Sequence, residues 1–152
     1  MTTVVPGLTE LAELTGQHLG HSDWIVVDQH RIDTFADATD DHQWIHTDPE
    51  RAAAGPFGGT IAHGFLTLSL LIPLWDDILT VEGVTTKVNY GLNKVRFTGP
   101  VPAGAKIRAA ATLVSVEEIK GDGVQVVVDF TVERDGSDKP ACVAQAVHRY
   151  YR

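Results

Sequence analysis

The sequence predicts an α+β fold in which an antiparallel β-sheet wraps around one long buried α-helix. The first observation is the stretch Ile61–Trp75, where almost every residue is apolar or small. A helix that is apolar on all its faces must be enclosed by other elements. The second observation is that four β-rich runs, separated by turn residues, follow one another after Gly83. Strands that follow one another in this way favour an α+β fold over an alternating α/β fold.

Length and composition exclude several classes of protein. The chain has 152 residues and is expected to form one domain, residues 1–152. Its net charge of −8 argues against a nucleic-acid partner. The only cysteine, Cys142, permits no internal disulfide and lies in an apolar run, so we expect it to be buried and inert. Because the sequence shows neither a signal peptide nor an apolar stretch of roughly 18 residues, we expect a cytoplasmic protein without a membrane partner.

The first part of the chain shows weak helical spacing of apolar residues between Leu8 and Leu14, and Gly16 closes this segment. Residues Trp24–Val27 have the composition of a short strand. Asp28 is a good N-cap for an amphipathic helix that extends to Thr39, where the polar cluster Asp40–His46 begins.

After the polar cluster, Pro49 stands at the first position of another helix. The small residues Ala52–Gly59 form a loop. Within the buried helix, Pro73 is expected to kink the helix or to mark its last turn. The four expected strands are Thr85–Phe97, Lys106–Val116, Val124–Glu133 and Ala141–Tyr151.

The cluster Asp40–His46 contains a possible acid–base pair. Asp41 and His46 are five residues apart and can meet only if the segment is a turn or an irregular loop. A carboxylate beside an imidazole can orient a water molecule and move a proton. The alternative is that both are solvated loop residues, or that Asp40 and Asp41 cap a helix. Trp44 and Ile45 favour the first reading, since they would pull the loop into a partly dry pocket.

His63 and Gly64 stand at the mouth of the buried helix. An amide N–H at a helix start is unpaired, and a glycine there lets a ligand oxygen approach the backbone closely. The alternative is a glycine selected for tight packing. For Ser69, farther along the helix, the simplest role is a hydrogen bond to the carbonyl one turn earlier.

Other chemistries find little support. His42 and His46 are four residues apart, but no His-Glu-x-x-His pattern and no pair of cysteines accompanies them, so no metal site is expected. The sequence has no Gly-x-Ser-x-Gly, no Gly-x-Gly-x-x-Gly and no P-loop.

The segments Asp41–Pro49 and Ile61–Leu66 together resemble the MaoC-like family, the (R)-specific enoyl-CoA hydratases and 3-hydroxyacyl-thioester dehydratases with a hot-dog fold. The resemblance extends from about Trp24 to Tyr151 and includes the strand Asn89–Phe97. It is strongest with the short, single hot-dog branch that includes nodulation-protein-N-like proteins. This resemblance implies a single hot-dog domain and a hydro-lyase of fatty acid metabolism.

The resemblance also implies roles for individual residues. Asp41 and His46 match the catalytic pair of the family, and Gly64 matches the glycine whose amide holds the thioester carbonyl. Ser69 matches a serine that supports the aspartate in some members, and His63 is expected to have a supporting role. Many members have Asn-Pro where this chain has Gln43-Trp44. Gln43 is therefore a further supporting candidate, without a defined role. The difference also leaves open which acyl-chain length the site prefers.

The implied reaction is the reversible (R)-specific hydration of a trans-2-enoyl thioester carried by CoA or an acyl-carrier protein, without a cofactor. The resemblance further implies a homodimer. One rival is a hot-dog thioesterase, which commonly has an acidic residue on the buried helix, whereas Ile61–Trp75 contains none. Another rival is a non-catalytic subunit that binds acyl thioesters, although the presence of Asp41 and His46 argues against it.

Overall fold

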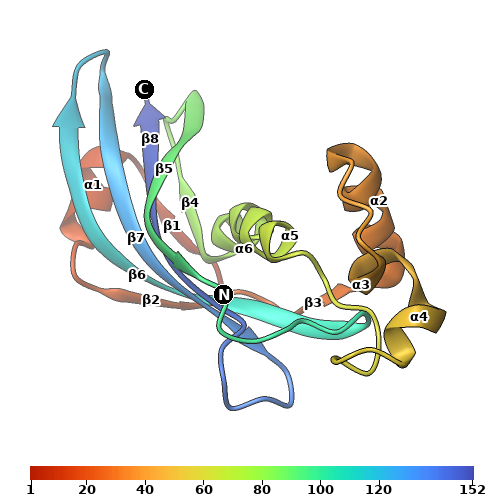
Figure 1. Cartoon of the computed structure of the whole chain (residues 1–152). Coiled ribbons are helices and arrows are strands. Elements are labelled where there is room, and N and C mark those ends of the chain that lie inside the picture. The colour runs from red at the N-terminus through yellow and green to blue at the C-terminus, as the bar shows by residue number, and fades with distance from the viewer.

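The computed structural model describes all residues, 1–152, and shows a curved antiparallel sheet with the central helices against its concave face (Figure 1). The strand order is β2-β6-β7-β8-β5, and β3 also pairs with β6. The strands are β2 (His18–His21), β3 (Ile25–Val27), β5 (Thr86–Arg96), β6 (Ala105–Ile119), β7 (Gly123–Arg134) and β8 (Cys142–Tyr151). The predicted α+β architecture, with an antiparallel sheet around a helix, is confirmed.

The inner face of the sheet forms most of the core. Alternate residues of β6, from Ile107 to Leu113, are almost completely buried, and so are Val126, Val128 and Phe130 on β7. This alternation places one set of side chains against the central helices. Cys142 is buried at the start of β8, as predicted, and burial raises the pKa of its thiol to about 11.

The central helix differs in two ways from the expectation over Ile61–Trp75. It consists of α5 (Gly64–Ser69) and α6 (Leu71–Ile78), which are interrupted at Leu70. Pro73 explains the interruption, because it has no N–H to donate to the carbonyl of Ser69, four residues earlier. The expectation of burial on every face was wrong, since Phe65, Ser69 and Pro73 recur along one exposed side of the helix.

The N-terminal residues form a strand that the sequence did not indicate. Strand β1 (Thr3–Val5) pairs in parallel with β4 (Leu79–Val81), which directly follows α6, in a separate two-stranded sheet. Between β1 and β2 lies α1 (Leu8–Glu13), close to the helical segment expected there. None of the helices is long and apolar enough to cross a membrane.

Three helices gather beyond the start of α5 (Figure 1). They are α2 (Gln29–Thr39), α3 (Trp44–Thr47) and α4 (Pro49–Ala53), and we refer to them as the cap helices. Both expected helix starts are confirmed: the Asp28 carboxylate accepts from the amide of Arg31 at 2.8 Å, and Asp48 caps α4, whose first residue is Pro49. The predicted acid–base pair lies here, with His46 on α3 and Asp41 in the turn between α2 and α3.

Candidate active site

His46 lies on the short helix α3 and is 6 % exposed. Its Nδ1 is 2.7 Å from the carbonyl oxygen of Ile61. A carbonyl oxygen can only accept a hydrogen bond, so Nδ1 carries the proton. In the neutral ring, Nε2 is therefore left with a lone pair that can accept a proton.

A second contact holds the backbone of His46. The side-chain amide of Gln29, the first residue of α2, donates to the His46 carbonyl at 2.7 Å and accepts from the Thr60 hydroxyl at 2.5 Å. Gln29 thus links two cap helices to the segment before α5. Sequence reasoning missed this residue, because nothing in its spacing relates it to His46.

Asp41 stands in the turn that follows α2. Helix α2 ends at Asp40, which adopts the left-handed conformation with φ of 59° and so redirects the chain. The Asp41 side chain is exposed, and its carboxylate accepts from the amide of Gln43 at 3.5 Å. The expectation of a partly dry pocket therefore holds for His46 but not for Asp41.

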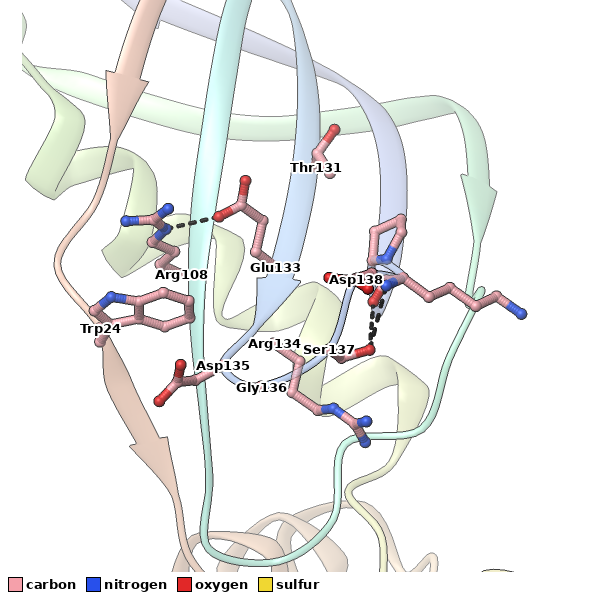
Figure 2. A pocket seen from close by; sticks show the side chains of 11 residues that line it. Trp24, Arg108, Thr131, Glu133, Arg134, Asp135, Gly136, Ser137 and Asp138 are labelled. Atoms are coloured by element: carbon pink, nitrogen blue, oxygen red, sulfur yellow. Dashed lines mark hydrogen bonds and ion pairs between the residues drawn. The ribbon is translucent and has the colours of Figure 1, made fainter.

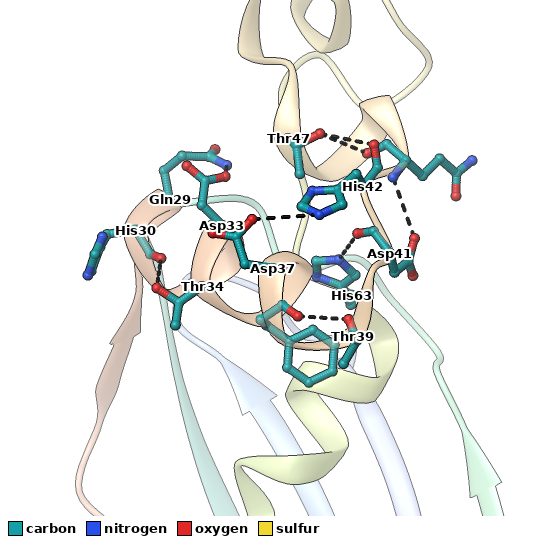
Figure 3. A network of polar contacts seen from close by, with 12 residues as sticks. Gln29, His30, Asp33, Thr34, Asp37, Thr39, Asp41, His42, Thr47 and His63 are labelled. Atoms are coloured by element: carbon teal, nitrogen blue, oxygen red, sulfur yellow. Dashed lines mark hydrogen bonds and ion pairs between the residues drawn. The ribbon is translucent and has the colours of Figure 1, made fainter.

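His63 connects the two members of the pair. Its ring stacks on that of His46, with centroids 3.8 Å apart and planes inclined by 24°. Its Nε2–H donates to the backbone carbonyl of Asp41 at 2.9 Å (Figure 3). The other nitrogen of His63, Nδ1, is buried without a hydrogen-bond partner, and Phe35 packs against the ring at 4.8 Å. His63 therefore contacts both Asp41 and His46.

The surroundings of His46 favour its neutral form. Burial lowers the pKa of His46 below the ordinary value of 6.5, and the neighbouring His63 lowers it further. The hydrogen bond to Ile61 and the charge of Asp41 act in the opposite direction without reversing the shift. The ring is thus a neutral proton acceptor at neutral pH.

Asp41, His46 and His63 also form a group of potential metal ligands. One potential ligand atom from each lies within 4.8 Å of the others. However, a metal must lie near the plane of each imidazole that binds it, at about 2.0–2.1 Å from the nitrogen. Two rings stacked 3.8 Å apart cannot both direct a lone pair at one ion in this way. The arrangement fits proton transfer better than metal binding.

Gly64, the first residue of α5, adjoins the acid–base pair through His63. Because it begins a helix, its amide N–H has no carbonyl partner within the helix. It lines a pocket of about 330 Å³ together with Phe57, Ile61, Thr67 and Phe97. A Cβ on Gly64 would come within 2.9 Å of the Phe97 ring, so only glycine fits without movement. Asp41 and His46 do not line this pocket themselves.

The remaining sequence candidates lie apart from the predicted acid–base pair or contribute backbone alone. The Ser69 hydroxyl donates to the carbonyl of Phe65 at 2.7 Å, and no hydrogen bond joins it to Asp41. Gln43 contributes its amide to Asp41, while its side chain forms no hydrogen bond. His42 pairs with the carboxylate of Asp37 at 3.6 Å on the exposed side of α2 (Figure 3).

Another hollow lies on the sheet, between β3 and the β7–β8 turn (Figure 2). Arg108 donates to Glu133 at 2.7 Å and lies over the Trp24 ring at 4.5 Å. Although burial alone acts in the opposite direction, hydrogen bonds from Arg108 and His21 lower the pKa of Glu133. This hollow contains none of the predicted site residues.

The fold and the site together define a hot-dog protein with a histidine–aspartate pair beside a helix start. A model of the family described as the MaoC like domain matches residues 10–134. The chain belongs to this MaoC-like dehydratase family, which makes it a hydro-lyase. The family predicted from the sequence is thereby confirmed.

Curated relatives match nearly the whole chain. It is 56 % identical over 143 residues to 3-hydroxyacyl-thioester dehydratase Z of Mycobacterium tuberculosis, covering 94 % of this chain and 95 % of that protein. It is 47 % identical over 140 residues to nodulation protein N of Rhizobium leguminosarum bv. viciae, covering 90 % and 86 %.

Solved structures support the same fold. A monoamine oxidase regulatory protein from Archaeoglobus fulgius aligns with a TM-score of 0.79 at 24 % identity, covering 100 % of this chain and 99 % of the other. An (R)-hydratase from A. caviae aligns with a TM-score of 0.66 at 22 % identity, covering 88 % and 94 %. At these identities the likeness concerns the fold alone.

Proposed function

We propose that the protein catalyses the reversible, (R)-specific hydration of trans-2-enoyl thioesters to (R)-3-hydroxyacyl thioesters. The proposal depends on one observation: polar side-chain atoms of Asp41, His46 and His63 lie within 4.8 Å of one another. His63 directly precedes Gly64, the first residue of α5. The name of the mycobacterial relative supports the substrate class, and the (R)-specificity is what the resemblance to the MaoC-like family implies.

In the proposed mechanism, one water molecule is held between the Asp41 carboxylate and Nε2 of His46. Its oxygen attacks C3 of the enoyl group while the catalytic pair takes up a proton. A proton is then delivered to C2 on the same side, so that one water supplies both the hydroxyl group at C3 and the hydrogen at C2. The charge that develops on the thioester oxygen is stabilised by the amide of Gly64. No cofactor takes part in these steps.

His63 acts in this scheme as a positioning residue. Its hydrogen bond to the Asp41 backbone sets the place of the carboxylate, and its ring supports one face of His46. His63 also directly precedes Gly64 in the chain. It therefore connects Asp41 and His46, which hold the water, to the Gly64 amide, which binds the thioester carbonyl.

The protein is also proposed to act as a homodimer. Strand β5 forms one edge of the sheet, and nearly all its residues are exposed. Apolar residues on this edge, Val88, Tyr90 and Leu92, are each more than 40 % exposed. A long exposed edge strand with apolar side chains is a template for pairing with another strand.

Substitution of the catalytic pair tests the proposed reaction. We expect Asp41→Asn and His46→Ala each to lower kcat for crotonyl-CoA hydration by at least about 100-fold, because each removes a positioned acid–base group. The measurement is the loss of enoyl absorbance, with circular dichroism to check the fold. His42→Ala is the matched control, since His42 is exposed and pairs with Asp37. Turnover close to that of the wild type in either catalytic variant would contradict the assignment.

The same assay separates hydration from thioester hydrolysis. Release of free thiol is followed beside the loss of enoyl absorbance, and chiral analysis of the product determines its configuration. We expect the (R)-3-hydroxyacyl-CoA to form without release of CoA. Central helices α5 and α6 carry carboxylates only at the far end, Asp76 and Asp77, away from Gly64.

A further inference from the structure

A second pocket lies between the central helices and the exposed edge of the sheet, and the proposed chemistry does not use it. Its volume is about 310 Å³, at the lower end of the range for small-molecule sites. The apolar part of its wall comes from both layers of the fold: Leu68, Leu71, Ile72, Leu92, Ala146 and Val147. We call it the distal pocket.

Three polar side chains interrupt this apolar wall: Ser69, Asn89 and His148. His148 is 5 % exposed, and its Nε2 is buried without a hydrogen-bond partner. Asn89 lies directly opposite His148 in the β5–β8 register, so their side chains share one face of the sheet. The Ser69 hydroxyl already donates to Phe65, which leaves its oxygen free to accept.

A buried nitrogen without a hydrogen-bond partner destabilises the folded state, so a histidine at position 148 requires an explanation. Its neighbours on β8 that face the same way, Ala144 and Ala146, are apolar. A leucine or valine would fill the same position without an unmet hydrogen bond. A histidine here therefore indicates that its other ring nitrogen, Nδ1, which is not enclosed and has no partner within the protein, pairs with a group in the pocket.

The chemistry of the pocket favours a neutral ligand group. Burial lowers the pKa of His148, and the nearby charge of Lys87 lowers it further, so the ring is uncharged at neutral pH. Lys87 itself is paired with Asp76 at 2.8 Å, and no charged side chain lines the pocket. A carboxylate or a phosphate would be poorly stabilised there. A hydroxyl can both donate to and accept from the three polar groups.

The distal pocket is within reach of the proposed thioester site. Ser69 stands five residues after Gly64, a rise of about 7.5 Å along a helix. Both pockets are bounded on the opposite side by the same part of the chain: Phe97, just after β5, walls the pocket at Gly64, and residues 89–92 of β5 wall the distal one. An acyl chain whose carbonyl is held at Gly64 can therefore run between α5 and β5 toward His148.

We propose that the distal pocket binds the far part of the acyl chain and selects chains that carry a neutral hydrogen-bonding group, such as a hydroxyl, near their end. This inference rests on the proposed function, because the chain is that of the thioester substrate. His148 and Asn89 determine the selectivity, and they do not take part in the chemistry.

The test compares matched substrates: trans-oct-2-enoyl-CoA and trans-dec-2-enoyl-CoA, each with and without a terminal hydroxyl. We expect wild-type kcat/KM to favour the hydroxylated member of at least one pair by roughly threefold to tenfold, the effect of one net hydrogen bond. In His148→Leu and in Asn89→Leu this ratio should fall to about one or below. His30→Leu, at an exposed histidine of α2 whose side chain forms no hydrogen bond, should leave the ratio unchanged.

Crotonyl-CoA separates failure of this inference from failure of the proposed function, because its chain is too short to reach His148. All three variants should hydrate crotonyl-CoA as the wild type does. Equal kcat/KM within both substrate pairs, or an unchanged preference in the leucine variants, would overturn the selectivity while hydration of crotonyl-CoA persists. If the wild type hydrates neither crotonyl-CoA nor any of the longer enoyl-CoAs, the proposed function itself fails. Should His148→Leu not fold, Asn89→Leu on the exposed edge strand decides the question.

Discussion

The two imidazoles of the site, those of His46 and His63, each donate one hydrogen bond to a backbone carbonyl. His46 donates to Ile61 and His63 to Asp41, so both tautomers follow from the fold. The consequence differs between the two rings. Nε2 of His46 is available for the reaction, whereas Nδ1 of His63 is enclosed and unpaired. In the proposed mechanism, the ring of His46 therefore takes part in proton transfer and the ring of His63 positions its neighbours.

The lowered pKa of His46 predicts the pH dependence of the reaction. Only neutral His46 can accept a proton, so kcat/KM should fall on the acid side around a pKa below the ordinary 6.5. In Asp41→Asn, the loss of a charge that raises this pKa should lower it further, as followed by NMR titration of the ring. A wild-type acid limb above pH 6.5 would contradict this account.

The same shift affects stability. Because burial depresses the pKa of His46 in the folded state, the unfolded chain takes up the proton first as the pH falls. The favourable contribution of the neutral ring is present above pH 6.5 and is lost as the pH falls through the lower, folded-state pKa. His148, whose pKa is lowered mainly by burial, acts in the same direction.

At the scale of elements, the start of α5 is the most constrained part of the site. Gly64→Ala should lower kcat/KM by about 10- to 100-fold, because the new methyl group meets the Phe97 ring and crowds the proposed carbonyl position. The free energy of unfolding should change by no more than about 1 kcal/mol, since alanine favours the helix while the contact opposes it. Steady-state kinetics and thermal denaturation measure the two effects.

Gly59→Ala is the matched control, because a Cβ there has nothing within 4 Å. It should retain wild-type kinetics. Equal loss of activity in both glycine variants would contradict the role given to Gly64.

Local signals in the sequence were enough to predict the elements around the site. Asp28 and Pro49 mark helix starts because capping chemistry depends on nearby residues. The four long strands could likewise be predicted from β-rich runs between turn residues. The equally short strand β3 was predicted from its composition, whereas β1 and β4 escaped prediction, because three residues carry no period and the two strands are brought together only in the folded chain.

The site was predicted where its residues form a contiguous motif and not where they meet through the fold. Asp41, His46 and Gly64 could be named from their order along the chain. The contacts of His46 with Ile61 and Gln29 join residues 15 and 17 apart, and no spacing rule relates them. The exposed side of the central helix was missed for a similar reason, since composition alone does not tell which face the sheet leaves uncovered.

At the scale of the whole molecule, the edge strand β5 predicts the oligomeric state. We expect the wild type to sediment with twice the mass of one chain, and Val88→Lys to shift it toward monomer, because like charges would meet across a two-fold axis. Val26→Lys is the matched control: Val26 is similarly exposed, but it lies on β3 at the other end of the sheet. A wild type that stays monomeric at all concentrations would exclude this pairing.

The anchoring of His46 to Ile61 has a consequence for how such a site can diversify. The loop between α4 and Thr60 does not hold the imidazole, since that ring is bound beyond the loop at Ile61. Lengthening a flexible loop costs little, about 0.6 kcal/mol for each doubling. Phe57 in this loop nevertheless walls the pocket at Gly64. Insertions can therefore remodel the pocket at Gly64 while leaving the contacts of His46 as they are, so that selectivity and catalysis in the proposed reaction are free to evolve separately.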